Sequence, residues 1–278
     1  MTPTPPGTPI PPPPHFGCIG GTLSLAGSSN LEPLLQQVNN DYAGICPQLT
    51  VSLKGTGNRA SLNLLSRGRI DVAASDLTAG SSWNVTDHAI AGLLYTLIAS
   101  PDVPLRNLTT TQIQGIYTGK ITNWSQVGGP DEAITVILRP ANDGITPVFR
   151  AFVLQGKPLH VKGIRLKPDA SSRAVQAVSS TPGAISYVPL GVTWGANVQV
   201  LAIDGVSSTT GSVLNGTYSF WSVEHCYTLG EGSAQFQDYL QFLDSEQEGN
   251  EVSQFGAVPI SAIDPDILAS HLPGPEIN

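Results

Sequence analysis

The feature that most constrains this chain is an alternation of short β-rich runs with amphipathic helical segments, joined by turns of small residues. The first run, residues 21–27, leads through a Gly-Ser-Ser-Asn turn into a segment that places Leu34, Val38 and Tyr42 on one helical face. A second β-rich run follows at residues 49–55. Alternating β and α elements favour parallel strands with right-handed crossovers, so we predict an α/β fold.

The same alternation continues along most of the chain. Further strands are predicted at residues 70–74, 92–100, 133–139, 184–190 and 198–204, and helices at residues 108–119, 146–156, 171–180 and 233–248. A chain of 278 residues is long enough for one large domain or two ordinary ones and buries a core without help from a metal. We find no internal repeat of the kind that builds solenoids.

The N-terminal segment has a different composition. Residues 1–14 read MTPTPPGTPIPPPP, and such a proline tract favours extended polyproline conformation. We interpret residues 1–16 as a stiff linker that holds the following domain away from a membrane or cell wall after removal of an upstream anchor. The alternative is a chain end with no role.

Charge and cysteine content exclude several function classes. The net charge is −8, from 13 Lys and Arg against 21 Asp and Glu, and no basic cluster is present, so we expect no nucleic-acid partner. Three cysteines and five histidines never fall at metal-ligand spacing, so we expect neither metal nor cofactor. No apolar run is long enough to span a bilayer, and the start shows no basic-then-apolar signal, so we expect the chain as given to be soluble.

Two of the cysteines are predicted to form a disulfide. Cys18 lies just before the first predicted strand and Cys46 just before the second, and neighbouring parallel strands start side by side. Adjacent strands lie about 4.8 Å apart, within the Cα separation that a disulfide requires. Cys226, within an apolar strand, is expected to stay a buried free thiol. A disulfide would indicate an oxidising, extracytoplasmic compartment.

Small polar residues follow three of the predicted strands. These residues are Ser28, Ser29 and Asn30 after the first strand, Asn58 in the loop after the second, and Ser75 and Asp76 after the third. In an open parallel sheet, ligands bind at the carboxyl ends of the strands. The first two loops also open helices, whose free N–H groups attract anions. Ordinary helix capping explains any one loop, but three together favour an anion site.

These loops belong to a set of motifs that resembles a known family. The motifs are AGSSNLEPL, KGTGNRASLNLLSRGRIDVAASDL, LTTTQIQGIYTGKITNWSQVGG, VILRPANDGITPVFRAFVL, TPGAISYVPLG and IDGVSSTTGSVLNGTYSF. In this order and spacing the chain resembles the phosphate-binding proteins of ABC importers, from Gly20 to Ile260. The resemblance implies a type II periplasmic-binding-protein fold, in which two α/β lobes with central mixed sheets surround a ligand cleft.

The resemblance also implies a set of ligand contacts. The family's first-loop donors correspond to Ser29 and Asn30, and its second-loop donor corresponds to Asn58, where the family usually has Ser. Its acceptor carboxylate corresponds to Asp76, and the guanidinium that clamps the anion corresponds to Arg139. The Gly-Ser-Gly-Thr donor loop of the family corresponds to Asn142, Asp143, Gly144 and Ile145.

That last loop departs from the family. Serine donates a hydrogen bond to a phosphate oxygen, whereas an ionised Asp143 only accepts and brings a negative charge toward an anion. Like charges about 4 Å apart cost on the order of 4 kcal/mol at an effective dielectric near 20. Phosphate binding would therefore suffer unless Asp143 turns away or is protonated.

From the sequence we predict an extracytoplasmic solute-binding protein, not an enzyme, that captures phosphate or a related small oxyanion. Its partner would be an ABC permease, and the protein would be a monomer. Residues 17–99 and 198–278 are predicted to form one lobe and residues 100–197 the other, with closure about a hinge. A ligand-sensing module of the same fold that has lost phosphate specificity is the alternative, because fold alone cannot separate the two roles. A phosphoester hydrolase is disfavoured because no activated nucleophile is found.

Overall fold

The computed structural model of the chain describes residues 16–140, 143–166 and 171–277. The helices are α1 (Glu32–Ile45), α2 (Asn58–Ser66), α3 (Thr110–Tyr117), α4 (Ile145–Phe152), α5 (Ser171–Ser180), α6 (Thr210–Leu214), α7 (Ala234–Leu243), α8 (Glu246–Gln254) and α9 (Pro265–Ala269). The strands are β1 (Gly21–Gly27), β2 (Leu49–Gly55), β3 (Val72–Ser75), β4 (Thr78–Ala79), β5 (Thr86–Ala99), β6 (Asn107–Leu108), β7 (Thr135–Leu138), β8 (Ile164–Arg165), β9 (Ala184–Pro189), β10 (Gln199–Ile203), β11 (Trp221–Thr228), β12 (Ala257–Pro259) and β13 (Glu276–Ile277).

One mixed sheet runs through the molecule in the order β2-β1-β3-β11-β5-β9-β7-β8. Strand β1 pairs in parallel with β2 and β3, whereas β11 is antiparallel to both β3 and β5. The long strand β5 connects the two halves of the sheet, because its first part pairs with β11 and its last five residues pair with β9. The prediction of parallel pairing holds for β1, β2 and β3, and the antiparallel pairs make the sheet mixed, as the predicted fold class requires.

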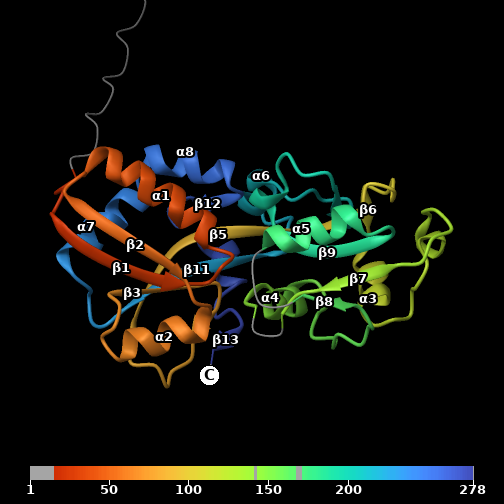
Figure 1. Cartoon of the computed structure of the whole chain (residues 1–278), viewed down its shortest axis with the longest axis horizontal. Helices are drawn as coiled ribbons and strands as arrows, with labels where there is room; N and C mark the ends of the chain where they lie inside the picture. Colours follow the sequence, from red (N-terminus) through yellow and green to blue (C-terminus); the bar gives the residue numbers. More distant parts are fainter. Residues whose placement is uncertain (1–15, 141–142, 167–170, 278) are drawn as a thin grey trace, which may run out of the picture.

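Helices cover both faces of the sheet (Figure 1). Beside β1 and β2, α1 packs together with α7 and α8, and α2 lies on the opposite face against β1 and β3. The apolar stripe of α1 ends at Tyr42, whose ring meets Tyr239 edge-on at 5.5 Å and Phe242 at 5.2 Å. In the other half of the sheet, α5 packs on β9, and Phe149 of α4 stacks on Tyr187 at 4.2 Å. Aromatic side chains thus form much of the core between layers.

The predicted elements are found, but some of their bounds differ. Strand β5 begins at Thr86, six residues before the predicted run 92–100, and α4 ends at Phe152, four residues before the end of the predicted helix 146–156. The single helix expected over residues 233–248 is wrong, because the chain forms two helices, α7 and α8, in its place. The side chain of Ser245 accepts a hydrogen bond from the backbone N–H of Glu248 at 3.3 Å, so the serine caps a new helix.

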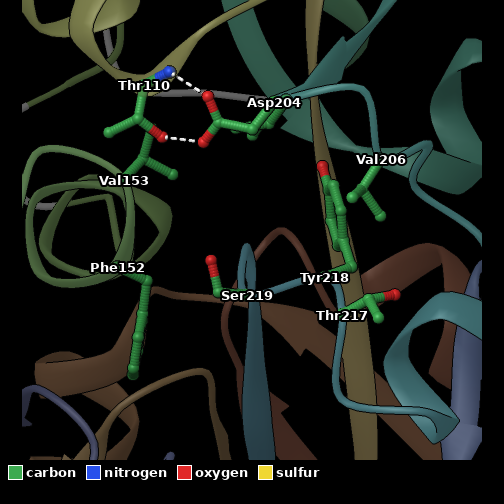
Figure 2. Close-up of a pocket in the computed structure, with 9 residues that line it drawn as sticks. Thr110, Phe152, Val153, Asp204, Val206, Thr217, Tyr218 and Ser219 are labelled. Atoms are coloured by element: carbon green, nitrogen blue, oxygen red, sulfur yellow. Dashed lines mark hydrogen bonds between the residues drawn. The ribbon is translucent and has the colours of Figure 1, made fainter.

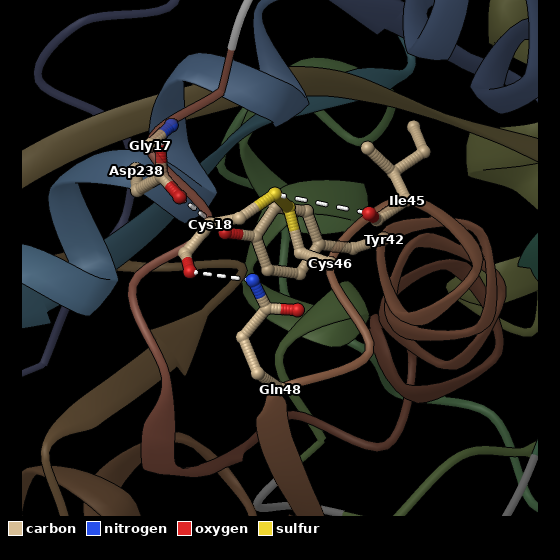
Figure 3. The surroundings of a disulfide bond; sticks show 7 residues. All are labelled: Gly17, Cys18, Tyr42, Ile45, Cys46, Gln48 and Asp238. Carbon is tan, nitrogen blue, oxygen red and sulfur yellow. Dashed lines mark hydrogen bonds between the residues drawn. A yellow bond between two sulfur atoms is a disulfide. The ribbon is translucent and has the colours of Figure 1, made fainter.

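The predicted disulfide is confirmed at the amino ends of β1 and β2 (Figure 3). The Cα atoms of Cys18 and Cys46 lie 5.0 Å apart. Around the bond, the Asp238 carboxylate accepts hydrogen bonds from Gly17 N and from the Tyr42 hydroxyl, each at 2.6 Å. This end of the sheet is therefore held both by a covalent bond and by hydrogen bonds to one carboxylate.

Cys226 is a free thiol in β11, as predicted, and burial raises its pKa to about 12. The division into two lobes stays a prediction. Residues 1–15 of the predicted linker lie outside the described residues, and so does Asn142.

Candidate functional site

The loops after β1 and β2 are held together by backbone hydrogen bonds at the carboxyl ends of the strands. The carbonyl oxygen of Gly27 accepts from Thr56 N at 2.9 Å and from Gly57 N at 2.8 Å. Ser28 N in turn donates to Ala74 O of β3 at 3.1 Å. A side chain at position 27 would place Cβ only 2.3 Å from Ala74 O, so this close approach requires glycine. The expected convergence of the three strand ends is confirmed.

Asn30 lies at the centre of the polar groups that these loops bring together. Its amide nitrogen donates to Asp76 Oδ2 at 2.8 Å and to Asp143 Oδ1 at 2.9 Å. Its amide oxygen accepts from Arg139 Nη2 at 3.1 Å and from the Ser171 hydroxyl at 3.0 Å. One buried side chain thus connects the loop after β1 with the residue after β7 and with the first residue of α5.

Arg139 follows β7 directly and forms a buried ion pair. Its Nε donates to Asp143 Oδ2 at 2.8 Å, and its Nη2 lies 2.5 Å from the same oxygen. The side chains of Arg139 and Asp143 are 1% and 7% exposed. Asp143 therefore turns inward, toward the anion position that the family resemblance implies. Both guanidinium nitrogens contact one carboxylate oxygen, and charge-assisted hydrogen bonds are about twice as strong as neutral ones.

Asp76 lies directly after β3 and is 1% exposed. Burial raises its pKa to about 6, and the Asp143 charge adds to this rise, while hydrogen bonds from Ser28 and Asn30 oppose it. Gly144 packs directly on this carboxylate, since a Cβ at that position would lie 2.1 Å from Asp76 Oδ2. Only glycine fits where the loop before α4 meets Asp76.

Three atoms of this cluster are buried and have no hydrogen-bond partner within the described residues. They are Asn58 Nδ2, Asp76 Oδ1 and Arg139 Nη1. The amide oxygen of Asn58 accepts from Asp76 N at 3.3 Å, which leaves its amide nitrogen as the free end. Unpaired buried polar groups are costly, so a cluster that holds three of them at strand ends is a candidate binding site. Two donors beside one acceptor suit an oxyanion that carries a proton.

The remaining predicted site residues differ in their placement. The Ser28 hydroxyl accepts from Asn30 N at 3.1 Å and lies within the cluster, and Ser29 is half-buried in the same turn. The Ser75 hydroxyl instead bonds the backbone of Leu77, both as donor and as acceptor, within its own turn.

Ser171 was not anticipated from the sequence. Its hydroxyl donates to Asn30 Oδ1 and accepts from Arg139 Nη2, each at 3.0 Å. The signal that could have found it is the Ser-Ser pair that opens the predicted helix 171–180, because a helix start supplies hydroxyl and N–H donors.

A second buried carboxyl group influences the charge of the site. Glu224 of β11 accepts hydrogen bonds from the Ser222 hydroxyl at 2.6 Å and from the Tyr95 hydroxyl at 3.1 Å. Burial raises its pKa well above the usual range, and the nearby Asp76 charge acts in the same direction. Glu224 and Asp76 are therefore two buried carboxyl groups whose negative charges disfavour each other.

A small cavity of about 70 Å³ lies away from this cluster, between α3, α4 and the segment before β11 (Figure 2). Its lining residues are Thr110, Phe152, Val153, Ile203, Asp204, Val206, Thr217, Tyr218 and Ser219. The Asp204 carboxylate there accepts from Thr110 N at 2.8 Å and from Thr110 Oγ1 at 2.5 Å. A cavity whose charged group is a carboxylate does not suit an anion.

The part of the chain that the structure describes contains neither a metal-binding cluster nor a membrane-spanning helix. No group of three or more His, Cys, Asp or Glu side chains there could hold a metal ion. No helix in the same residues has both the length and the apolar character needed to cross a membrane.

Comparison with known proteins gives consistent matches. The PBP superfamily domain matches residues 13–247 of the chain. The phosphate-binding protein PstS of Bacillus subtilis (strain 168) is 28% identical over 247 residues, which cover 87% of this chain and 81% of that protein. PstS of Borreliella burgdorferi is 27% identical over 199 residues, covering 67% of this chain and 70% of that protein. Among solved structures, the chain is similar to a putative phosphate ABC transporter substrate-binding protein with bound phosphate from Clostridium perfringens. The two superpose with a TM-score of 0.77 at 22% identity, and the match covers 86% of this chain and 100% of that one.

Proposed function

Because the chain belongs to the PBP superfamily and has a type II periplasmic-binding-protein fold, we propose that it captures phosphate outside the cytoplasm and delivers it to an ABC importer. The names of the matched relatives, phosphate-binding protein PstS, support this ligand. The disulfide between Cys18 and Cys46 supports an oxidising compartment.

The observation that carries the proposal is the set of three unpartnered buried atoms at the strand ends. Asn58 Nδ2 and Arg139 Nη1 can each donate to an oxyanion, and Asp76 Oδ1 can accept a proton from it. Phosphate keeps at least one proton at neutral pH, whereas sulfate keeps none. An ionised Asp76 therefore accepts a hydrogen bond from phosphate and repels sulfate. The site would distinguish the two anions by the repulsion between the Asp76 carboxylate and an unprotonated sulfate oxygen.

Two helix starts add to the attraction for an anion. Helix α2 begins at Asn58 and α5 begins at Ser171, so the positive ends of both helix dipoles lie at the cluster. By the predicted boundaries, Asn58 and Asp76 belong to the lobe of residues 17–99 with 198–278 and Arg139 to the lobe of residues 100–197, so a ligand bound to all three would contact both lobes. We propose that phosphate joins these lobes and that the phosphate-bound, monomeric form is recognised by the permease.

Calorimetric titration of the purified protein tests this function. At neutral pH, phosphate should bind with one site per chain, and sulfate should bind at least about a hundredfold more weakly, because it leaves the buried carboxylate without a proton donor. Asp76→Asn is the informative variant, since a neutral amide no longer repels sulfate and the preference for phosphate should shrink. Absence of phosphate binding, or equal binding of the two anions by the wild-type protein, would contradict the proposal.

A further inference from the structure

The Asp143 carboxylate makes the kind of contacts that a bound oxyanion would make. Oδ2 lies on the guanidinium fork of Arg139, at 2.8 Å from Nε. Oδ1 accepts from Asn30 Nδ2 at 2.9 Å and from Ile145 N, the first N–H of α4, at 3.2 Å. A cation, a side-chain amide and a helix N–H together form a typical anion environment.

These contacts also connect parts of the chain that are far apart in sequence. Arg139 precedes Asp143 by four residues, whereas Asn30 is 113 residues away, in the loop after β1. Asn30 belongs to the first predicted lobe, and Arg139 and Asp143 belong to the second. The carboxylate therefore bridges two segments that would separate if the predicted lobes opened.

We propose that Asp143 is an internal substitute for the anionic ligand: it occupies the Arg139 fork and the Asn30 donor, holds the site closed without ligand, and is displaced when ligand binds. That the displacing anion is phosphate rests on the proposed function. It assigns to Asp143 the role of a specificity-determining residue, because only an anion that outcompetes this carboxylate gains the site.

The charges explain why displacement is required. Asp76 and Asp143 carry two negative charges against the one positive charge of Arg139, so an added anion would face a net negative cluster. Once Asp143 leaves, the guanidinium fork and the Asn30 amide nitrogen become available beside Asn58 Nδ2. The ligand then gains the donors that the carboxylate releases.

Phosphate affinity of matched variants tests the displacement. Asp143→Ser removes the competing charge and supplies a hydroxyl donor, and Asp143→Asn keeps the side-chain shape without the charge. Titrated calorimetrically with inorganic phosphate at neutral pH, Asp143→Ser should bind at least tenfold more tightly than the wild type, and Asp143→Asn should fall between them. Glu231→Gln, an exposed position with the same change of charge, should stay within twofold of the wild type.

Small-angle X-ray scattering without any ligand tests the closure independently. The wild-type protein should be compact, with the radius of gyration of the closed structure. Asp143→Ser should show a larger radius of gyration, which returns to the wild-type value when phosphate is added to saturation. Asp143→Asn also leaves Arg139 without a carboxylate, so its radius of gyration without ligand should likewise exceed that of the wild type.

The possible results separate the two proposals. Unchanged or weaker phosphate affinity in both folded variants would overturn the displacement, and compact variants without phosphate would overturn the closing role. If the ligand-free variants open but neither they nor the wild type bind phosphate, the proposed function is wrong and the closing role of Asp143 is confirmed.

Discussion

The two ends of strands β1 and β2 are built in opposite ways. At the amino ends, the disulfide between Cys18 and Cys46 joins the strands, and the Asp238 carboxylate has hydrogen-bond donors on both oxygens. At the carboxyl ends, Asn58 follows β2 and Asp76 follows the neighbouring strand β3, and Asn58 Nδ2 and Asp76 Oδ1 are buried without partners among the described residues. This half of the sheet is therefore cross-linked at the amino ends of its strands and holds buried polar atoms without partners at the carboxyl ends.

This difference shows how a binding site can be both rigid and incomplete. Unpaired buried polar atoms lower the stability of the ligand-free protein, and a fixed platform elsewhere offsets that cost. The amino ends hold the strand register, from Gly21 opposite Leu49 to Gly27 opposite Gly55, so the loops at the other end keep their positions. If the two ends are independent, a change at one end should leave the other unaffected.

The largest effect is expected at the carboxyl ends, from Arg139→Ala. Loss of the buried cation leaves Asp76 and Asp143 without their counter-charge, and removing one partner of a buried charge pair costs several kcal/mol. Phosphate affinity measured by calorimetry should fall at least about a hundredfold. Arg67→Ala, which removes an exposed arginine after α2, should leave it unchanged. A loss no greater than that of Ser29→Ala would place Arg139 outside the site.

The matching change at the amino ends is the double substitution of Cys18 and Cys46 by serine. The free energy of unfolding measured in denaturant should fall by about 3 kcal/mol, since the disulfide closes a loop of moderate length. Phosphate affinity should stay within about twofold of the wild type, because the loops at the other end keep their backbone hydrogen bonds. A reducing agent should destabilise the wild type but not the variant. A large loss of affinity would show that the two ends are coupled.

The free energy of unfolding of Asp76→Asn, compared with that of the wild type, should depend on pH. The folded-state pKa of Asp76 is raised from 3.8 to about 6, so the folded protein binds this proton more tightly than the unfolded chain does. The contribution of Asp76 to stability is therefore greatest below about pH 4 and is lost as the pH rises through 6.

Without phosphate, the stability of Asp76→Asn relative to the wild type should rise by about 2 to 3 kcal/mol between pH 4 and pH 7. Denaturant unfolding across this range measures the difference, and effects that do not depend on pH cancel. A flat difference would mean that Asp76 titrates normally.

The smallest effect is expected from Ser29→Ala. Ser29 is half-buried and neutral, and loss of one neutral hydrogen bond costs about 1 kcal/mol. Phosphate affinity should fall by no more than about fivefold in the same titration. A loss approaching that of Arg139→Ala would show that neutral donors, rather than the guanidinium, dominate binding.

The sequence predicted the positions that depend on strand topology. Asn30, Asn58 and Asp76 follow strands of the same sheet, so their meeting point could be inferred from the order of strands and loops alone. The disulfide followed from the same reasoning at the opposite strand ends.

What the sequence could not give depends on side-chain direction and on contacts distant along the chain. The motif comparison placed Asp143 in the donor loop but left open whether its carboxylate faces the cluster. Ser171 reaches Asn30 across 141 residues, a contact that no local pattern contains. The division of one expected helix at Ser245 depended on a single capping hydrogen bond, which competes with helix continuation.

A crystal structure of the protein grown with phosphate tests the central claim most directly. We expect phosphate within hydrogen-bond distance of Asn58 Nδ2, Asp76 Oδ1 and Arg139 Nη1, with the Asp143 carboxylate moved off the guanidinium. Phosphate bound elsewhere, or bound while Asp143 still pairs with Arg139 and Asn30, would contradict the account.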